Sequence, residues 1–352
     1  MNPSDLASRC GEWLKGTGPE ADVVISTRLR LARNLVGFPF LIRAGPEDRK
    51  RLLRLVSERI RGTLTGKDYF FCDLEVAEPI DRQVLVERHL ISRELAEGEG
   101  SRGVAFSPDE SVAIMINEED HLRLQVLRSG LEVETAWKEI ERIDGDLEKK
   151  LTFAFSPELG YLTACPTNVG TGLRASVMLH LPALVMTDQV DKVINAVSKL
   201  SLAVRGLYGE GTQASGDFYQ ISNQITLGET EGEIMESLRS VVPQIISSER
   251  KAREALLSEN RVGLEDRIWR SYGMLKSARS ITSEETMQLL SGVRLGVNLR
   301  LLPDLRMRTV NEIFMMAQPG HLQKIEGKEL TQPRRDVARA EFIRSRLNGK
   351  RL

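Results

Sequence analysis

Apolar residues follow two different spacings through the first 228 residues, and each spacing predicts its own kind of element. Recurrence at three and four positions predicts helices, and short apolar runs between turn-like breaks predict strands. The predicted helices cover 46–61, 131–149 and 188–204. The predicted strands lie at 69–77, in three runs within 103–127, at 173–181 and around 218–221. The three runs within 103–127 have the pattern of antiparallel strands. We therefore expect an α+β domain here.

The chain after about residue 228 has a helical pattern almost throughout. Thr282 with Glu285, and Thr309 with Glu312, have the spacing of a capping box, in which each side chain bonds a free backbone N–H at the start of a helix. Pro303 and Pro319 stand where helices are expected to end. The change of pattern predicts three parts, which are a lead-in over 1–24, an α+β domain over 25–250 and an all-helical domain over 251–352.

Length and composition describe a soluble globular protein. The 352 residues are 41% hydrophobic and 28% charged, and the formal net charge of −1 argues against bulk binding of nucleic acid or a membrane surface. The cysteines, Cys10, Cys72 and Cys165, are too few and too widely spaced for a disulfide framework or a zinc site. The N-terminus has no apolar signal segment, and no apolar run reaches the ~20 residues of a membrane helix. We expect a cytoplasmic protein without a resident metal.

One basic segment has the pattern of an anion site. Ser26 to Asn34 reads STRLRLARN and follows the apolar run Val23–Ile25. On a strand, Arg28 and Arg30 point to the same face. Two guanidinium groups on one face repel each other unless an anion lies between them, and phosphate fits because arginine binds it bidentately. A solvated basic strand edge is the alternative explanation.

Three further segments carry polar clusters that are ambiguous when taken singly. Asn117–Arg123 (NEEDHLR) ends an apolar strand with three acids, which turn solvation also explains. Cys165–Gly172 (CPTNVGTG) precedes a strand with Arg174 and could present N–H groups to an anion, although it is no Walker A loop and a tight turn explains it equally. Arg205–Thr212 (RGLYGEGT) places an arginine and a glutamate around a flexible turn, as a helix-ending loop also would.

Together and in this order, the four segments resemble the guanidino kinases, the ATP:guanidino phosphotransferase (phosphagen kinase) family of creatine kinase and arginine kinase, over about 22–228. The resemblance implies an antiparallel sheet flanked by helices, with 25–250 as the catalytic domain and 251–352 as a regulatory or oligomerisation domain. It also implies ATP as the phosphoryl donor, with Mg²⁺ bound through the nucleotide. The implied arginine cage for the phosphates is Arg28, Arg30, Arg123, Arg174 and Arg205.

Other residues are implied to contact the nucleotide. His89 resembles the nucleotide-contacting histidine of the family, although its surrounding motif is looser and a packing histidine is the alternative. The remaining implied contacts are Ser26, Thr27, Leu29 and Glu210, together with the backbone around Ala175, Ser176, Val177 and Met178 and around Gly206, Leu207, Tyr208 and Gly209.

The resemblance also implies the groups that act on the acceptor. Glu119 and Glu210 match the two substrate-facing carboxylates of the family, and Cys165 matches its reactive-site cysteine. A protonated guanidinium is a poor nucleophile, and deprotonating it at pH 7 costs about 7–9 kcal/mol. Two carboxylates can clamp the planar group and accept its proton, and a thiolate adds a third negative contact.

Two features resemble the bacterial protein-arginine kinases (McsB type) more closely than the metabolic enzymes. Only 25 residues precede Ser26, where the small-molecule kinases carry a helical domain that closes over the acceptor. The segment Arg335, Asp336, Val337, Ala338, Arg339 and Ala340 matches the RDxxRA motif, which in that subfamily forms a phosphoarginine-binding allosteric pocket. A basic amphipathic helix with Ala338, Phe342 and Ile343 on its core face is the alternative.

The expected function is therefore transfer of the ATP γ-phosphoryl group to arginine in proteins, in stress response and protein quality control. The resemblance implies protein substrates such as a heat-shock repressor, a Clp chaperone–protease system, an activator protein and a homo-oligomer of two or more chains. It implies neither a membrane nor direct nucleic-acid binding. The alternatives are a kinase of a free guanidino metabolite and a non-enzymatic adaptor that binds phosphoarginine.

Overall fold

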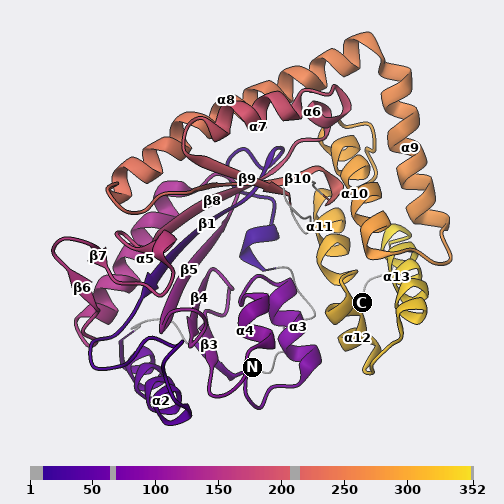
Figure 1. Ribbon diagram of the computed structural model, residues 1–352. Helices are drawn as coiled ribbons and strands as arrows, with labels where there is room; N and C mark the ends of the chain where they lie inside the picture. The colour runs from indigo at the N-terminus through magenta and orange to yellow at the C-terminus, as the bar shows by residue number, and fades with distance from the viewer. Residues whose placement is uncertain (1–10, 64–68, 207–214, 350–352) are drawn as a thin grey trace.

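The computed structural model describes residues 11–63, 69–206 and 215–349, and its centre is an eight-stranded antiparallel sheet (Figure 1). The strand order is β2-β3-β4-β5-β1-β8-β10-β9. The strands are β1 (Val24–Arg33), β2 (Phe70–Asp73), β3 (Gly103–Phe106), β4 (Val112–Ile116), β5 (Leu122–Ser129), β8 (Leu173–His180), β9 (Leu202–Gly206) and β10 (Phe218–Asn223). A separate hairpin pairs β6 (Phe155–Ser156) with β7 (Gly160–Tyr161). The expected α+β fold with an antiparallel sheet is confirmed.

One face of the sheet is covered by helices and forms the larger core. In β1, Leu29 and Leu31 point to this face and are fully buried. The helix α5 (Val133–Glu148) packs across β1 and β5, and its apolar residues recur three and four apart, as burial of one helix face requires. Helices α2 (Pro46–Thr63) and α8 (Glu231–Glu259) add their apolar faces to the same core, and Figure 1 shows α8 running along the sheet.

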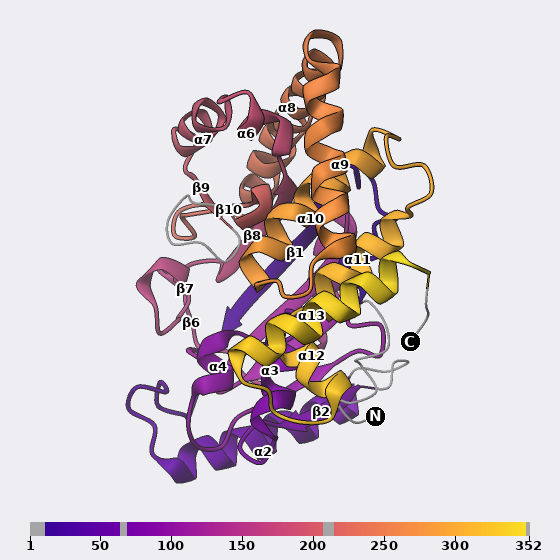
Figure 2. The same ribbon diagram turned by 90° about the vertical axis from the view of Figure 1, so that its right-hand side faces the viewer.

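The other face of the sheet is divided along the strands. At one end, Ile25, Leu127, Met178 and Phe218 pack into a second core with the C-terminal helices. Further along β1 the same face carries Arg28 and Arg30, which no helix covers completely, since both line a cleft. The C-terminal helices are α9 (Arg261–Ser277), α10 (Ser283–Asn298), α11 (Met307–Met316), α12 (Pro319–Glu326) and α13 (Gln332–Leu347). Figure 2 shows α9 and α13 on the side away from the sheet.

The lead-in segment joins the sheet to the C-terminal helices. Its short 3-10 turn η1 (Glu12–Leu14) contacts β1 and β5, and Trp13 belongs to the second core. From the helical side, the Asn311 side chain donates a hydrogen bond to the Leu14 carbonyl oxygen at 2.7 Å. The lead-in is therefore held from both sides.

A smaller layer connects the far edge of the sheet to the helical part. Helices α3 (Pro79–Glu87) and α4 (Arg93–Glu97) pack on β3 and β4 around a third core that includes Leu85, Leu90 and Val104. The Glu87 carboxylate at the end of α3 accepts hydrogen bonds from the backbone N–H groups of Gly320 and His321 at 2.6 and 3.0 Å. These groups open α12, so the contact satisfies free donors at a helix start.

Two local predictions were wrong for identifiable reasons. The helix predicted over 188–204 is α7 (Val190–Ser198), and the chain then turns at Ser201, whose φ of 57° no helix admits, to form β9. A short helix α6 (Pro182–Met186) precedes it. Thr309 caps nothing, because α11 begins at Met307, and the Glu312 carboxylate is bonded instead to Arg308 and Arg346.

Two further helix predictions were right in part. Thr282 caps α10 by accepting the Glu285 N–H at 3.1 Å, without the reciprocal bond of a full capping box, and Pro319, expected at the end of a helix, stands in the first turn of α12. Thr230 and Glu233 form a complete capping box at the start of α8. The predicted division at 250/251 falls inside α8, and the assignment of domains stays a prediction. Within the described residues, no helix is both long and apolar enough to cross a membrane.

Candidate active site

A row of polar side chains crosses the sheet from strand to strand. Along β1 and its neighbours, Arg30 lies opposite Arg174 of β8, and Ala32 lies opposite Arg123 of β5. On the far side of β10, Gln220 lies opposite Arg205 of β9. Because side chains alternate along a strand, these positions share one face with Arg28. Four segments far apart in the sequence are thus brought side by side.

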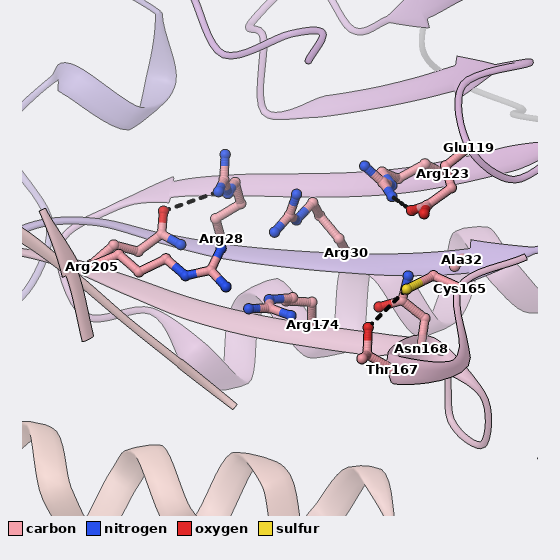
Figure 3. Close-up of a pocket in the computed structure, with 12 residues that line it drawn as sticks. Arg28, Arg30, Ala32, Glu119, Arg123, Cys165, Thr167, Asn168, Arg174 and Arg205 are labelled. Carbon is pink, nitrogen blue, oxygen red and sulfur yellow. Dashed lines mark hydrogen bonds and ion pairs between the residues drawn. The ribbon is translucent and has the colours of Figure 1, made fainter. Parts of the chain in front are cut away.

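The five predicted cage arginines line one cleft of about 320 Å³ (Figure 3). Arg205 lies at one end of this cleft, and Glu119 and Cys165 lie at the other. We call it the arginine cleft. Its lining is Arg28, Arg30, Ala32, Glu119, Arg123, Cys165, Thr167, Asn168, Gly172, Arg174, Arg205 and Gln220.

The electrostatics of the arginine cleft favour a polyanion. Burial, with the nearby charges of Arg123 and Arg174, lowers the pKa of Arg28 to about 10. Burial, together with Arg28, Arg123 and Arg174, lowers the pKa of Arg30 well below its ordinary value. In the described chain, no acid forms an ion pair with Arg28, Arg30 or Arg174. These guanidinium groups stay protonated at neutral pH and repel one another, so an anion with several charges would stabilise all of them.

The three successive acids after β4 have three different surroundings. The Glu118 carboxylate is buried and accepts a hydrogen bond from Arg123 Nη1 at 2.6 Å. Glu119 is half exposed at the cleft and contacts Arg123 Nη2 at 3.1 Å. Asp120 is fully buried and points away from the cleft. Only Glu119 of the three is therefore free to approach an acceptor from solvent.

Asp120 holds together the segments that form this end of the cleft. Its Oδ1 atom accepts hydrogen bonds from the Asn34 side chain at 2.6 Å and from the Ala164 backbone N–H at 2.7 Å. Asn34 follows β1, and Ala164 directly precedes Cys165. The side chain of Asn34 in turn accepts the His121 N–H at 3.0 Å. Glu119 and Cys165 are therefore positioned by one buried carboxylate that lies between them in the fold.

The segment that begins at Cys165 is a tight turn. Cys165 Sγ lies 3.0 Å from Thr167 Oγ1, and the 3-10 turn η2 (Pro166–Asn168) follows. Backbone N–H groups here donate within the protein, as from Gly170 to the Tyr161 oxygen. Gly172 has φ of 65°, and a Cβ atom there would lie 2.7 Å from the Ala32 oxygen, so a side chain would not fit. The turn explanation for these glycines is the one that the structure favours.

A second, smaller cavity of about 10 Å³ adjoins the arginine cleft. It is lined by Trp13, Ser26, Arg28, His89, Leu127, Ser176, Met178 and Gln220. His89 is partly buried, and burial with nearby positive charge lowers its pKa to about 3, so the imidazole is neutral. Its φ of 58° lies in the left-handed region, which costs free energy and is typical of functional sites.

Several residues among the predicted nucleotide contacts turn their side chains away from the cleft, so only their backbone could face a nucleotide there. The side chains of Leu29, Ala175 and Val177 point to the opposite face of the sheet, into the larger core. Thr27 is also buried there, where its hydroxyl donates to the Gly130 oxygen at 2.8 Å. Gly206 ends β9. Leu207, Tyr208, Gly209 and Glu210 lie outside the described residues.

The RDxxRA segment lies on α13, with its two arginines in different surroundings. Arg339 is fully buried, and its guanidinium donates to the carbonyl oxygens of Ala317 and Ile281 and to Asp336 at 2.6–2.9 Å. Arg335 is half-buried and donates to the Leu330 oxygen at 2.8 Å. A cavity of about 400 Å³ beside α13 is lined by Ala338, Phe342 and others rather than by the two arginines, and Val337 is exposed. Ala340 and Ile343 face the second core.

Sequence reasoning missed several residues of the site. Asp120 and Glu118 were noticed only as neighbours of Glu119. The role of Asp120 depends on its bond to Asn34, which is far away in the sequence, and that of Glu118 depends on how the Arg123 side chain is oriented. Gln220 bonds Arg28 at 3.0 Å, and its place opposite Arg205 could have been found only by pairing β10 with β9. Trp13 carried no motif at all.

Known families and relatives match this chain over nearly its whole length. Residues 52–252 match the family model described as ATP:guanido phosphotransferase, C-terminal catalytic domain, and residues 261–351 match the model of the protein-arginine kinase McsB C-terminal domain. A protein-arginine kinase of Symbiobacterium thermophilum is 49% identical over 99% of this chain and 100% of its own length. One from Halothermothrix orenii is 47% identical, with 99% of this chain and 100% of that protein covered.

Solved structures of guanidino kinases share the fold. The duplicated taurocyamine kinase of Schistosoma mansoni, with bound transition state analog components, is 29% identical with a TM-score of 0.61 over 69% of this chain and 35% of that chain. The present chain thus spans about a third of that duplicated protein. Lombricine kinase is 28% identical with a TM-score of 0.59, and the match covers 72% of this chain and 71% of that chain.

Proposed function

The chain belongs to the ATP:guanido phosphotransferase family and, within it, to the protein-arginine kinases, and on this premise we propose how its residues carry out the reaction. It is an ATP-dependent kinase of arginine in proteins. One observation supports the assignment of the site above all others: five arginines from four strands line a single cleft that ends at a carboxylate and a thiol. We assign the phosphates of ATP to the arginines and the acceptor to the end with Glu119 and Cys165.

The arginines act by binding and electrostatic stabilisation. Arg28, Arg30 and Arg174 have no acidic partner within the described residues, so their hydrogen-bond donors are available to phosphate oxygens. Charge that develops on the transferring phosphoryl group is stabilised by donors that are already in place. An arginine at this position contributes about 10³–10⁵-fold to the rate in other phosphoryl-transfer enzymes. Mg²⁺ would enter with the nucleotide as part of the substrate and would offset part of the charge of its phosphates.

Arg123 connects the two halves of the site. In the structure its guanidinium is shared between the carboxylates of Glu118 and Glu119. A phosphate group competes for Arg123, and Glu118, which is buried, keeps its share of the contact. Glu119 is then released toward solvent and toward the acceptor guanidinium. Before the reaction, Arg123 therefore holds the Glu119 carboxylate, which the substrate arginine needs as its own partner.

The reaction exchanges one bond to the γ-phosphorus for another. The acceptor guanidino nitrogen attacks the γ-phosphorus, a nitrogen–phosphorus bond forms, and the bond from phosphorus to the β–γ bridging oxygen breaks. ADP leaves with that electron pair, and the proton of the guanidinium passes to a carboxylate. Glu119 is the described carboxylate in position to clamp the group and take the proton, and Cys165 adds a polar contact beside it. Glu210 is the second carboxylate by resemblance to the family.

The cellular setting is part of the same proposal. We infer a cytoplasmic enzyme of stress response and protein quality control, with substrates such as a heat-shock repressor, an activator protein and a Clp chaperone–protease system. We also infer assembly into a homo-oligomer and a phosphoarginine pocket around Arg335 and Arg339. The support is the protein-arginine kinase family and the McsB C-terminal match over 261–351.

Direct detection of the product tests the proposal. The purified chain, incubated with MgATP and an arginine-rich protein, should yield phosphoarginine by mass spectrometry under non-acidic conditions. Glu119→Gln should lower the signal at least about a hundredfold, whereas Asp266→Asn, which alters an exposed ion pair of α9, should not. Faster turnover of free arginine than of protein would instead assign a metabolite kinase. Phosphoarginine binding without any transfer would assign an adaptor.

A further inference from the structure

Trp13 is buried at the junction of the sheet, the lead-in and the C-terminal helices. It is 1% exposed, and its ring meets the His89 ring edge-on at 4.5 Å between centroids. Phe314 of α11 contacts it at 6.2 Å in the same manner. The lead-in that carries Trp13 is the indigo turn near the centre of Figure 1. The indole is therefore fixed in orientation by aromatic neighbours on two sides.

Two buried nitrogen atoms lie at this junction without hydrogen-bond partners. Within the part of the chain that the structure describes, neither Trp13 Nε1 nor His89 Nε2 has a partner. Both residues line the small cavity next to the arginine cleft. An indole N–H always donates, and a buried donor left unpaired is unfavourable. The pair of unsatisfied groups on one cavity therefore indicates a ligand with polar ring atoms.

The small cavity and the arginine cleft share two lining residues that are hydrogen-bonded to each other. Arg28 and Gln220 line both spaces, and Arg28 Nη2 donates to Gln220 Oε1 at 3.0 Å. The small cavity of about 10 Å³ has room for roughly one water molecule as it stands. A phosphate bound to Arg28 would compete with Gln220 for the guanidinium. Loss of that bond would free the Gln220 side chain, which lines both spaces, to move and make room for a ligand between them.

We propose that Trp13 recognises the purine base of the nucleotide, with its indole N–H donating to a ring nitrogen and His89 completing the base site. The inference rests on the proposed assignment of the phosphates to the arginine cleft. A purine offers flat apolar faces and several acceptor nitrogens at its edge, which matches an aromatic wall with one unpaired indole N–H and one unpaired imidazole nitrogen. The neutral state of His89 suits an uncharged base.

Trp13 also connects base recognition to the helical part. The Asn311 side chain of α11 donates to the Leu14 oxygen, and Arg294 of α10 donates to Asn311 at 2.8 Å. Arg294 donates as well to the Ala21 oxygen at 3.1 Å. The lead-in thus takes its position from helices outside the sheet. Trp13 would therefore be a specificity residue that comes from the lead-in, outside both the sheet and the lining of the arginine cleft.

Binding of ATP compared with inorganic tripolyphosphate tests the assignment. Trp13→Phe keeps the ring and removes the N–H donor, so ATP affinity should fall about five- to tenfold, whereas tripolyphosphate affinity should stay within twofold. Arg174→Gln should weaken both ligands alike. Equal loss of both ligands in Trp13→Phe, or no loss of either, would overturn the role of Trp13. If Arg174→Gln left the affinities for ATP and tripolyphosphate unchanged, the phosphate assignment would be overturned instead.

Fluorescence gives a second measurement that does not depend on the stability of a Trp13 variant. The chain has three tryptophans, and Trp137→Phe with Trp269→Phe leaves Trp13 as the sole indole emitter. Saturating ATP should quench or shift its emission, and saturating tripolyphosphate should have a much smaller effect. Unchanged emission with bound ATP would rule out contact between the base and Trp13.

Discussion

Removal of the Glu110 carboxylate should destabilise the fold more than almost any other single change of a charged residue. Glu110 and Arg88 are fully buried, and two parallel hydrogen bonds of 2.7 and 2.6 Å join them. Arg88 Nη1 lies 3.2 Å from His321 Nε2, and His321 Nδ1 lies 2.7 Å from Glu87. The cluster connects α3 of the sheet part to α12 of the helical part.

The size of the effect follows from burial. A buried ion pair that loses one partner leaves an uncompensated charge, which costs about 3–5 kcal/mol. Replacement of both charges by apolar residues of similar volume is often neutral or stabilising. We therefore expect about 3–5 kcal/mol of destabilisation for Glu110→Ala, and a much smaller effect for Arg88→Met combined with Glu110→Leu. The exposed pair of Arg270 and Asp266 contributes at most about 1 kcal/mol, so Asp266→Asn is the matched control.

Urea unfolding followed by circular dichroism measures the difference. With a denaturant slope of about 3 kcal/mol per molar, the midpoint for Glu110→Ala should fall by roughly 1–2 M. Transitions of the sheet and helical parts could separate in this variant, and near-UV and far-UV signals would then diverge. A midpoint within about 0.3 M of the Asp266→Asn control, or a double variant as unstable as the single one, would refute the reasoning.

Three further predictions concern the site. Glu119→Gln should lower kcat about 10²–10⁴-fold and leave ATP affinity equal or higher, because Arg123 gains freedom; equal losses in both would contradict the assigned role. Cys165→Ser should keep the contact to Thr167 and lower kcat less than Glu119→Gln does, as initial rates would show. The pKa of His89 is lowered from 6.5 to about 3 in the fold, so the unfolded chain binds a proton there first as pH falls. The contribution of His89 to the free energy of unfolding should be complete above pH 6.5 and lost as pH falls toward 3. His89→Asn should flatten this part of a profile of melting temperature against pH.

The sequence was sufficient to place Arg28 and Arg30 on one face, because strand parity is a local property, whereas Arg123, Arg174 and Arg205 were assigned through the family resemblance. Arg28 and Arg30 lie two residues apart on the face of β1 that lines the cleft. Arg33 lies an odd number of residues from both, points to the opposite face of the sheet and pairs with Asp144 at 2.7 Å. The register between strands, which sets Arg30 opposite Arg174, is not local and entered only through the family resemblance.

What the sequence could not predict depends on partners far along the chain. Glu118, Glu119 and Asp120 are chemically alike, and they differ only because Arg123, solvent and Asn34 meet them separately. The end of α7 was missed because apolar spacing continues into Leu200, which the structure leaves exposed, while a turn at Ser201 starts β9. Local patterns describe a residue's own element and give no information about the neighbour that completes its environment.

The charge arrangement of the arginine cleft argues for an order of events. Burial and the positive charge of neighbouring arginines lower the pKa of Arg28, Arg30 and Arg174, so an anion that enters the cleft relieves an electrostatically unfavourable arrangement. Glu119, in contrast, already has a cation in Arg123 and gains little from a second guanidinium while that contact persists. A triphosphate both relieves the crowding and competes for Arg123. On the proposed assignment of the site, nucleotide binding therefore frees the Glu119 carboxylate for the acceptor arginine, and productive binding of the protein substrate should follow it.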